Sequence, residues 1–171
     1  NFVYAEPLNV TDLKVAPDGS VFFTMGGRDT EGGVYRVVYK GWSGGNWGEK
    51  VSGAMAAVRQ PEPLSSWGHA AILKVKEELG DQFGPELEKI ARDTNAADLD
   101  RVRALFLIER VGPRAKYELL QPLSQDASAA VRAAAYYVVG CHGSDRAKAL
   151  AASGAKDADP FVRRRALEAV V

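Results

Sequence analysis

Cysteine is almost missing from this chain of 171 residues, which contains Cys141 alone. A single cysteine excludes a disulfide within the chain and a metal site built on several thiolates. Histidine is nearly as rare, and the two that occur, His69 and His142, lie far apart in the sequence. His142 directly follows Cys141, but haem attachment requires a Cys-x-x-Cys-His motif, and its first cysteine is absent. Each histidine is therefore interpreted as a surface or helix-end residue rather than a ligand.

An excess of charge of either sign is also lacking, because 22 Lys and Arg residues balance 22 Asp and Glu residues. A neutral chain gives no electrostatic reason to expect nucleic acid or an anionic membrane as a partner. No run of eighteen apolar residues occurs, so membrane insertion is not expected. The first residues lack the basic and apolar regions of a signal peptide. The chain starts without Met and stops at Val171 within an apolar helical pattern, so we expect a fragment truncated at its C-terminus.

The usual combinations of catalytic residues are missing as well. Cys141 and His142 are neighbours, and neighbours on a helix point about 100° apart, so they do not form a nucleophile–base pair. The glycine pairs at 26–27 and 32–33 are not followed by the Gly-Lys-Ser/Thr of a phosphate-binding loop. We therefore expect no catalytic, cofactor-binding or metal-binding residue in this segment, and no small-molecule ligand.

What is present is a phrase that occurs twice. Residues 126–135 and 157–166 both begin with Asp and continue into Val-Arg, at Val131-Arg132 and at Val162-Arg163. A fainter copy precedes them, where residues 95–101 lead into Val102-Arg103. A fixed period of about thirty residues is typical of stacked repeat units. We expect Val102, Val131 and Val162 to occupy equivalent buried positions in one stack.

Helical periodicity extends through residues 64–171. We expect helices over about 65–79, 83–91, 99–111, 115–123, 127–140, 145–155 and 161–171, which amounts to three to four helix pairs. In the helix over 99–111 one side is predicted to face inward and the other to face water. The inward residues are Val102, Leu105, Phe106 and Ile108, and the outward ones are Arg101, Glu109 and Arg110.

These residues resemble HEAT-type repeats, including the short alanine-rich kind found in bacteria. In such repeats an Asp ahead of the second helix and an Arg within it form a ladder between adjacent units. The resemblance assigns this ladder to Asp126 with Arg132 and to Asp157 with Arg163, while the first copy offers Arg103 near Asp98. The arginine of a unit can reach backbone carbonyls or an aspartate across the stack. We expect the charged residues to be partly exposed and to stabilise the joints modestly, by about 0.5–1.5 kcal/mol each.

The first forty residues have a different pattern, typical of strands. Residues 10–15 and 21–24 alternate or are rich in strand formers, and they flank a Pro17-Asp18-Gly19 turn signal. A third strand is expected from Gly33 to Tyr39, with Val34, Arg36 and Val38 on one face and Tyr35, Val37 and Tyr39 on the other. Three such strands make about one blade of a β-propeller, and one blade cannot bury both of its faces by itself.

Residues 8–41 resemble a blade of the glucose/sorbosone dehydrogenase-like β-propellers, the pyrroloquinoline-quinone type of sugar dehydrogenase. Similar blades, followed by helical repeats, occur in large multidomain exported proteins of Planctomycetes-like bacteria. The resemblance implies that the longer protein uses pyrroloquinoline quinone, Ca²⁺ and a c-type haem, and that it is periplasmic or otherwise exported. Those family sites lie on other blades, so none is transferred to a residue of this segment.

The predicted architecture is therefore an α+β fragment: a partial antiparallel blade over 1–41, a linker over 42–63, and an all-α solenoid over 64–171. Trp42 and Trp47 in the linker would pin it to a neighbouring domain or stack on a sugar ring. Two functions remain open. The segment is a non-catalytic scaffold that binds a protein or the neighbouring domains, or it is the C-terminal part of a sugar or alcohol oxidoreductase whose active site lies elsewhere.

Overall fold

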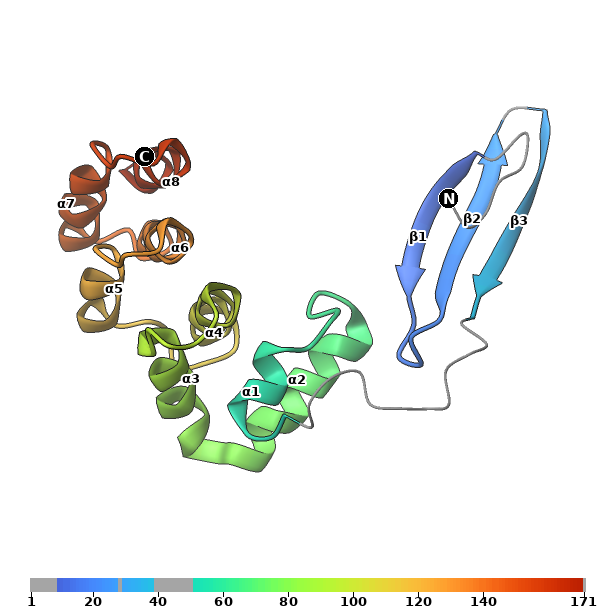
Figure 1. Ribbon diagram of the computed structural model, residues 1–171, viewed down its shortest axis with the longest axis horizontal. Helices are drawn as coiled ribbons and strands as arrows, with labels where there is room; N and C mark the ends of the chain where they lie inside the picture. Colours follow the sequence, from blue (N-terminus) through green and yellow to red (C-terminus); the bar gives the residue numbers. More distant parts are fainter. Residues whose placement is uncertain (1–8, 28, 39–50, 171) are drawn as a thin grey trace.

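The computed structural model describes residues 9–27, 29–38 and 51–170 of the chain. They form a small β-sheet followed by a helical stack (Figure 1). The fold class expected from the sequence is confirmed. Trp42, Trp47 and Tyr39, to which the sequence interpretation gave roles, lie outside the described residues.

The sheet is an antiparallel meander in the order β1-β2-β3, with strands Val10–Val15, Val21–Gly27 and Thr30–Val37. The β1–β2 turn follows its predicted chemistry: Gly19 has a φ of 78°, and the Asp18 carboxylate accepts a hydrogen bond from the Ser20 amide at 3.0 Å. The register aligns Leu13, Phe23 and Tyr35 across the three strands, and the rings of Phe23 and Tyr35 stack with centroids 5.1 Å apart.

Neither face of the sheet is covered among the described residues. Leu13 and Tyr35 on one face and Val34 on the other are exposed, and Ser20 is the one sheet-region residue that is buried. The apolar strand residues therefore gain little from leaving water, as expected for a single unpaired sheet.

The helical stack contains eight α-helices and one short 3₁₀ helix in the described part of the chain. They are α1 (Ala54–Val58), α2 (Ser66–Leu79), η1 (Gly80–Gln82), α3 (Phe83–Arg92), α4 (Asp98–Arg110), α5 (Tyr117–Leu123), α6 (Ala129–Gly140), α7 (Asp145–Gly154) and α8 (Pro160–Val170). Ser65 caps α2 through the Gly68 amide at 3.0 Å, and Ser144 caps α7 through the Ala147 amide at 3.2 Å.

Two rows of helices build the stack from α3 onward. The pairs α3–α4, α5–α6 and α7–α8 follow one another, with α4 packed on α6 and α6 packed on α8. Figure 1 shows the row of α4, α6 and α8 on the inside of an arc, and α3, α5 and α7 on the outside. Between the rows lies one continuous core, which includes Leu87, Ile108, Leu119, Val138 and Ala166.

One helix was not predicted from the sequence. Residues 54–58, assigned to the linker, form α1, and the side chains of Ala54, Ala57 and Val58 are buried in the same core. The helix is only five residues long and follows Gly53, which has a φ of 62°. So short a segment has too few residues for a helical period to be visible, and its stability comes from contacts with α2, α3 and α4.

Candidate functional site

The three inner helices share a 31-residue register. Ala104, Ala135 and Ala166 advance by that spacing and are all fully buried where neighbouring helices approach. Val131 and Val162 fit the same register and are buried. Val102 does not fit it and is only partly buried, so its expected equivalence with the other two valines is corrected. The equivalent position in α4 is Asp100, whose buried carboxylate accepts hydrogen bonds from Arg59 at 2.8 and 3.1 Å.

A ladder of Arg–Asp pairs joins consecutive helix pairs. The Arg101 guanidinium donates two hydrogen bonds to both carboxylate oxygens of Asp126, and Arg132 does the same to Asp157 at 2.8 and 2.9 Å. Each arginine thus pairs with the aspartate of the following unit rather than its own. Bidentate pairing of this kind fixes orientation as well as adding energy.

The sequence assignment of Asp126 with Arg132 and of Asp157 with Arg163 therefore needs correction. Within one unit the arginine contacts backbone: Arg132 Nη1 donates to the Asp126 carbonyl at 2.9 Å, and Arg163 Nη1 donates to the Asp157 carbonyl at 2.8 Å. Arg103 belongs to no rung and approaches the Val58 carbonyl at 3.5 Å. Aligning Val102-Arg103 with the two later Val-Arg dipeptides, two residues away from the true register, led to Arg103 being named in place of Arg101. The other two pairs were assigned within one unit, whereas the contacts run between units.

The first rung is more deeply buried than its sequence suggested. Arg101, expected to face water, has a side chain only 4% exposed, and that of Asp126 is 10% exposed. Arg101 Nε also donates to the Ala91 carbonyl at 3.2 Å, so the guanidinium is satisfied on several sides. In a buried pair, removing one partner leaves an uncompensated charge, and this costs more than the modest energy expected for an exposed pair.

The pKa values of the ladder groups follow from these contacts. The hydrogen bond from Arg101 lowers the pKa of Asp126, and the hydrogen bond from Arg132 lowers the pKa of Asp157. In return, Asp157 raises the pKa of Arg132. The ladder is therefore a set of charged groups held in their ionised forms, which suits a structural joint.

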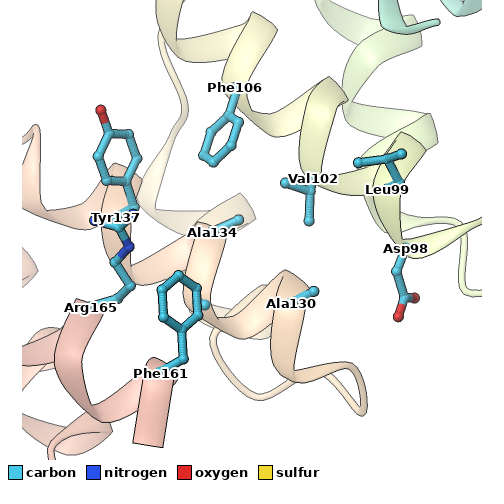
Figure 2. Close-up of a pocket in the computed structure, with 10 residues that line it drawn as sticks. Asp98, Leu99, Val102, Phe106, Ala130, Ala134, Tyr137, Phe161 and Arg165 are labelled. Carbon is cyan, nitrogen blue, oxygen red and sulfur yellow. The ribbon is translucent and has the colours of Figure 1, made fainter. Parts of the chain in front are cut away.

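A hollow of about 460 Å³ opens on the inner surface, across α4, α6 and α8 (Figure 2). Its floor is made by small residues of the middle helix, Ala130, Ala133 and Ala134. Larger side chains from the flanking helices form its walls; they are Leu99, Val102 and Phe106 from α4 and Phe161 and Arg165 from α8. We call this feature the inner groove. The groove exists because alanines face it from α6 while α4 and α8 carry bulky residues there.

Aromatic rings shape one end of the inner groove. Tyr137 meets Phe106 edge to face, with centroids 5.4 Å apart. The Arg165 guanidinium lies 5.2 Å from the ring centroids of both Tyr137 and Phe161, and it donates a hydrogen bond to Glu168 at 2.8 Å. These contacts hold the rings in place while leaving Tyr137 and Phe161 about half exposed to solvent. Asp98, at the far end in Figure 2, accepts a hydrogen bond from the Ser128 hydroxyl at 2.6 Å.

The inner groove was not predicted as a site. Val102 and Phe106 were expected in the core, yet both are partly buried residues that line the groove. The 31-residue register contains the signal, because it aligns Leu99, Ala130 and Phe161 at one exposed position. A large–small–large sequence across three inner helices predicts a hollow, but only once the register is correct.

The two histidines and the cysteine do not form a site. His69 is exposed on α2, and His142 Nε2 lies 3.2 Å from the Glu109 carboxylate, which also receives the Ala115 amide at 3.2 Å. Cys141 is exposed as a residue, but partial desolvation of its thiol raises the pKa of that thiol, and the Glu109 charge adds to the effect. Among the described residues no group of three or more His, Cys, Asp or Glu side chains is placed to hold a metal ion. In the same residues no helix is long and apolar enough to span a membrane.

Comparison with known proteins identifies the family of the helical stack. The family model of HEAT repeats matches residues 84–171, just over half of the chain and the part in which the helix pairs, the ladder and the inner groove lie. No curated protein and no solved structure matches the chain. On its paired helices, its 31-residue register and this match, the chain belongs to the HEAT-repeat family.

Proposed function

We propose that this chain is a protein-interaction module that binds a segment of a partner protein in the inner groove. The observation that carries the proposal is the exposure of Leu99, Tyr137 and Phe161 around an alanine floor. Large apolar side chains clustered on a surface hollow are typical of interaction sites, because covering them removes apolar area from water. HEAT repeats support this proposal, since stacked repeats present extended surfaces of this kind.

The lining of the inner groove also favours a peptide over a reacting substrate. Asp98, Arg165 and Tyr137 are the ionisable residues among those that line it, and Asp98 and Arg165 already have partners in Ser128 and Glu168. An apolar floor and aromatic walls suit one or two large aliphatic or aromatic side chains of a partner. The Arg101–Asp126 and Arg132–Asp157 pairs join the units that contain α4, α6 and α8. The groove is therefore formed before a partner binds.

A matched pair of variants tests the proposal. Peptides selected from a displayed random library on the immobilised chain should share a large apolar residue. Ala130→Arg places a long side chain into the groove from an exposed position of α6, and Ala152→Arg places the same side chain on an exposed position of α7. We expect the first variant to weaken the selected peptides at least about tenfold and the second to leave their affinity unchanged, as measured by fluorescence anisotropy. Selection without a consensus, or equal loss in both variants, would contradict the proposal.

We also propose a context for the sheet, in which it forms one blade of a larger β-propeller of the glucose/sorbosone dehydrogenase-like kind. Its uncovered apolar face, with Leu13, Phe23 and Tyr35 in one row, favours packing against further β-sheet. On this reading pyrroloquinoline quinone, Ca²⁺ and haem would be bound by other parts of a longer exported protein. Dye reduction by that longer protein, with added quinone and Ca²⁺ and a panel of sugars, tests it; no reduction with any sugar would contradict it.

A further inference from the structure

The C-terminal end of the stack, formed by α7 and α8, exposes residues whose equivalents are buried in the preceding units. In the 31-residue register, Leu105, Tyr136 and Leu167 are equivalent, and their exposed fractions are 1%, 3% and 55%. Likewise Ile108 and Val139 are buried, whereas the equivalent Val170 is 38% exposed. These equivalent positions on α4, α6 and α8 thus carry large, mainly apolar side chains, which are buried on α4 and α6 and exposed to solvent on α8.

The structure also shows what covers the equivalent residues. The Tyr136 ring lies against α7, so close that a Cβ built on Gly154 would come within 2.4 Å of it, and the Tyr136 hydroxyl is 3.3 Å from that of Ser153. Tyr136 is therefore buried by the first helix of the next unit. Leu167, at the equivalent position of α8, lacks such a helix among the described residues.

Arg163 shows the same pattern in its hydrogen bonds. Its Nη1 donates to the carbonyls of Asp157 and Ala158 at 2.8 and 2.9 Å, repeating the bonds of Arg132 Nη1 to the carbonyls of Asp126 and Ala127. In Arg132 the Nε and Nη2 edge carries the bidentate pair with Asp157. In Arg163 that edge makes no hydrogen bond to a described residue, so a guanidinium fork held by backbone carbonyls faces outward.

We propose that the end face of α7 and α8 is a docking surface for a further helix pair of the same kind, joined to α8 by a short loop. That helix pair presents an aspartate to the Nε and Nη2 edge of Arg163, as Asp157 is presented to Arg132. Its first helix covers Leu167, as α7 covers Tyr136, and the added unit also buries Val170, the equivalent of the buried Val139. The interfaces of α4 with α6 and of α6 with α8 already have the same register. The end face continues this series, so the expected occupant is another helix pair of the same kind.

A second copy of this chain fits the end face less well. Stacking end to end would require the face of α3 and α4 that points away from α5 and α6, and α1 already packs there on both helices. The residue of the first unit equivalent to Asp126 and Asp157 is Asn95, whose neutral amide does not supply the carboxylate that Arg163 would pair with. Charge and access therefore both favour an added unit over a copy.

The test extends the whole chain by one unit. A copy of residues 141–171 is placed after Val171, which keeps the 31-residue register and supplies an aspartate at the position of Asp157. We expect one cooperative thermal transition at a midpoint at least about 5 °C higher, and slower amide exchange at Leu167 and Val170. A control extension with the same composition in scrambled order should leave the midpoint unchanged. An appended copy that stays unfolded by NMR, with no change in the midpoint, would overturn the proposal.

Arg163 provides the second measurement. Arg163→Ala should lower the thermal midpoint more in the extended chain than in the natural chain. Changing the appended copy of Asp157 to asparagine should remove this difference between the two chains. Equal effects of Arg163→Ala in both chains would overturn the assigned pairing. Light scattering of the natural chain completes the test: a concentration-dependent dimer that Leu167→Lys abolishes would show that a second copy covers the face, contrary to the proposal.

Discussion

The sheet and the helical stack contain similar apolar residues but place them differently. In the sheet, Leu13, Phe23 and Tyr35 line up across three strands and remain open to solvent on a surface that no described residue covers. In the stack, each helix pair covers the one before it, so that Leu119, Val138 and Ala166 lose all or nearly all contact with water. Burial in this protein depends on having a neighbour of the same kind; the repeat supplies that neighbour, whereas no part of the chain that the structure describes supplies one for the sheet.

Amide hydrogen exchange should reveal this difference most strongly. We expect amides of β2 to exchange on the order of a thousandfold faster, relative to their unfolded rates, than those of α6, because the sheet opens locally while α6 opens only with the whole stack. Mass spectrometry of peptic fragments after timed labelling measures both regions in one sample. Equal protection of the two regions would mean that the sheet is stabilised by contacts that the described residues do not include.

The same substitution in the two regions should change stability by very different amounts. Val131→Asp puts an unpaired carboxylate into the core of α6 and should cost about 3–5 kcal/mol of unfolding free energy. Val34→Asp, on an exposed position of β3, should change the helical transition by less than about 0.5 kcal/mol. Urea unfolding followed by circular dichroism at 222 nm compares them. A small effect of Val131→Asp would show that the 31-residue register is misassigned.

Ion pairs offer a third comparison, between the buried rung and an exposed pair in the sheet. Asp126→Ala leaves the buried Arg101 guanidinium without its carboxylate and should cost about 3 kcal/mol. Asp18→Ala removes the partner of Arg36, and because both of those side chains are about half exposed, the loss of stability should be much smaller than that of Asp126→Ala. Denaturant midpoints give both values. Similar costs for the two variants would mean that burial does not strengthen the rung.

Features that depend on residues close together in the sequence were predicted better than features that depend on contacts between helices. Local patterns were sufficient for α2, α6, α7 and the Pro17-Asp18-Gly19 turn, because capping residues, helical periodicity and turn chemistry act within a few residues. The ladder needed knowledge of which residues meet across units, and a two-residue error at Val102 reassigned its first arginine from Arg101 to Arg103. Helix α1 and the inner groove depend on packing between separate helices, for which short stretches of sequence contain no period.

Two glycines allow a comparison of packing density between the helical stack and the sheet. A Cβ at Gly154 would approach the Tyr136 ring to 2.4 Å and the Ala166 Cβ to 2.7 Å, whereas one at Gly26 in β2 meets nothing within 4 Å. Gly154→Ala should therefore cost about 1–2 kcal/mol, since overpacking outweighs the gain in helix propensity. Gly26→Ala should leave the helical transition unchanged. Thermal melts monitored at 222 nm check both, and a stabilised Gly154→Ala variant would mean that α7 can move away from α6.

The smallest expected effect is a pH dependence in the second rung. The hydrogen bond from Arg132 lowers the pKa of Asp157 in the folded state, so its stabilisation is present above the unfolded value of about 3.9 and is lost as the pH falls through the folded pKa. Asp157→Asn should cost about 1–2 kcal/mol at pH 7, and the difference from the natural chain should close as the pH falls through the lowered pKa of Asp157. A pH-independent cost for Asp157→Asn would contradict the pairing.

The arrangement of α4, α6 and α8 side by side also sets a measure for anything that crosses them. Packed helices lie about 8–10 Å apart, and a peptide in the polyproline II conformation advances about 3.1 Å per residue with every third side chain on the same face. A partner segment running across the inner groove would therefore meet a new helix at about every third residue. A partner segment bound as proposed would place side chains three residues apart on successive helices, and the largest of them would lie over the alanines of α6.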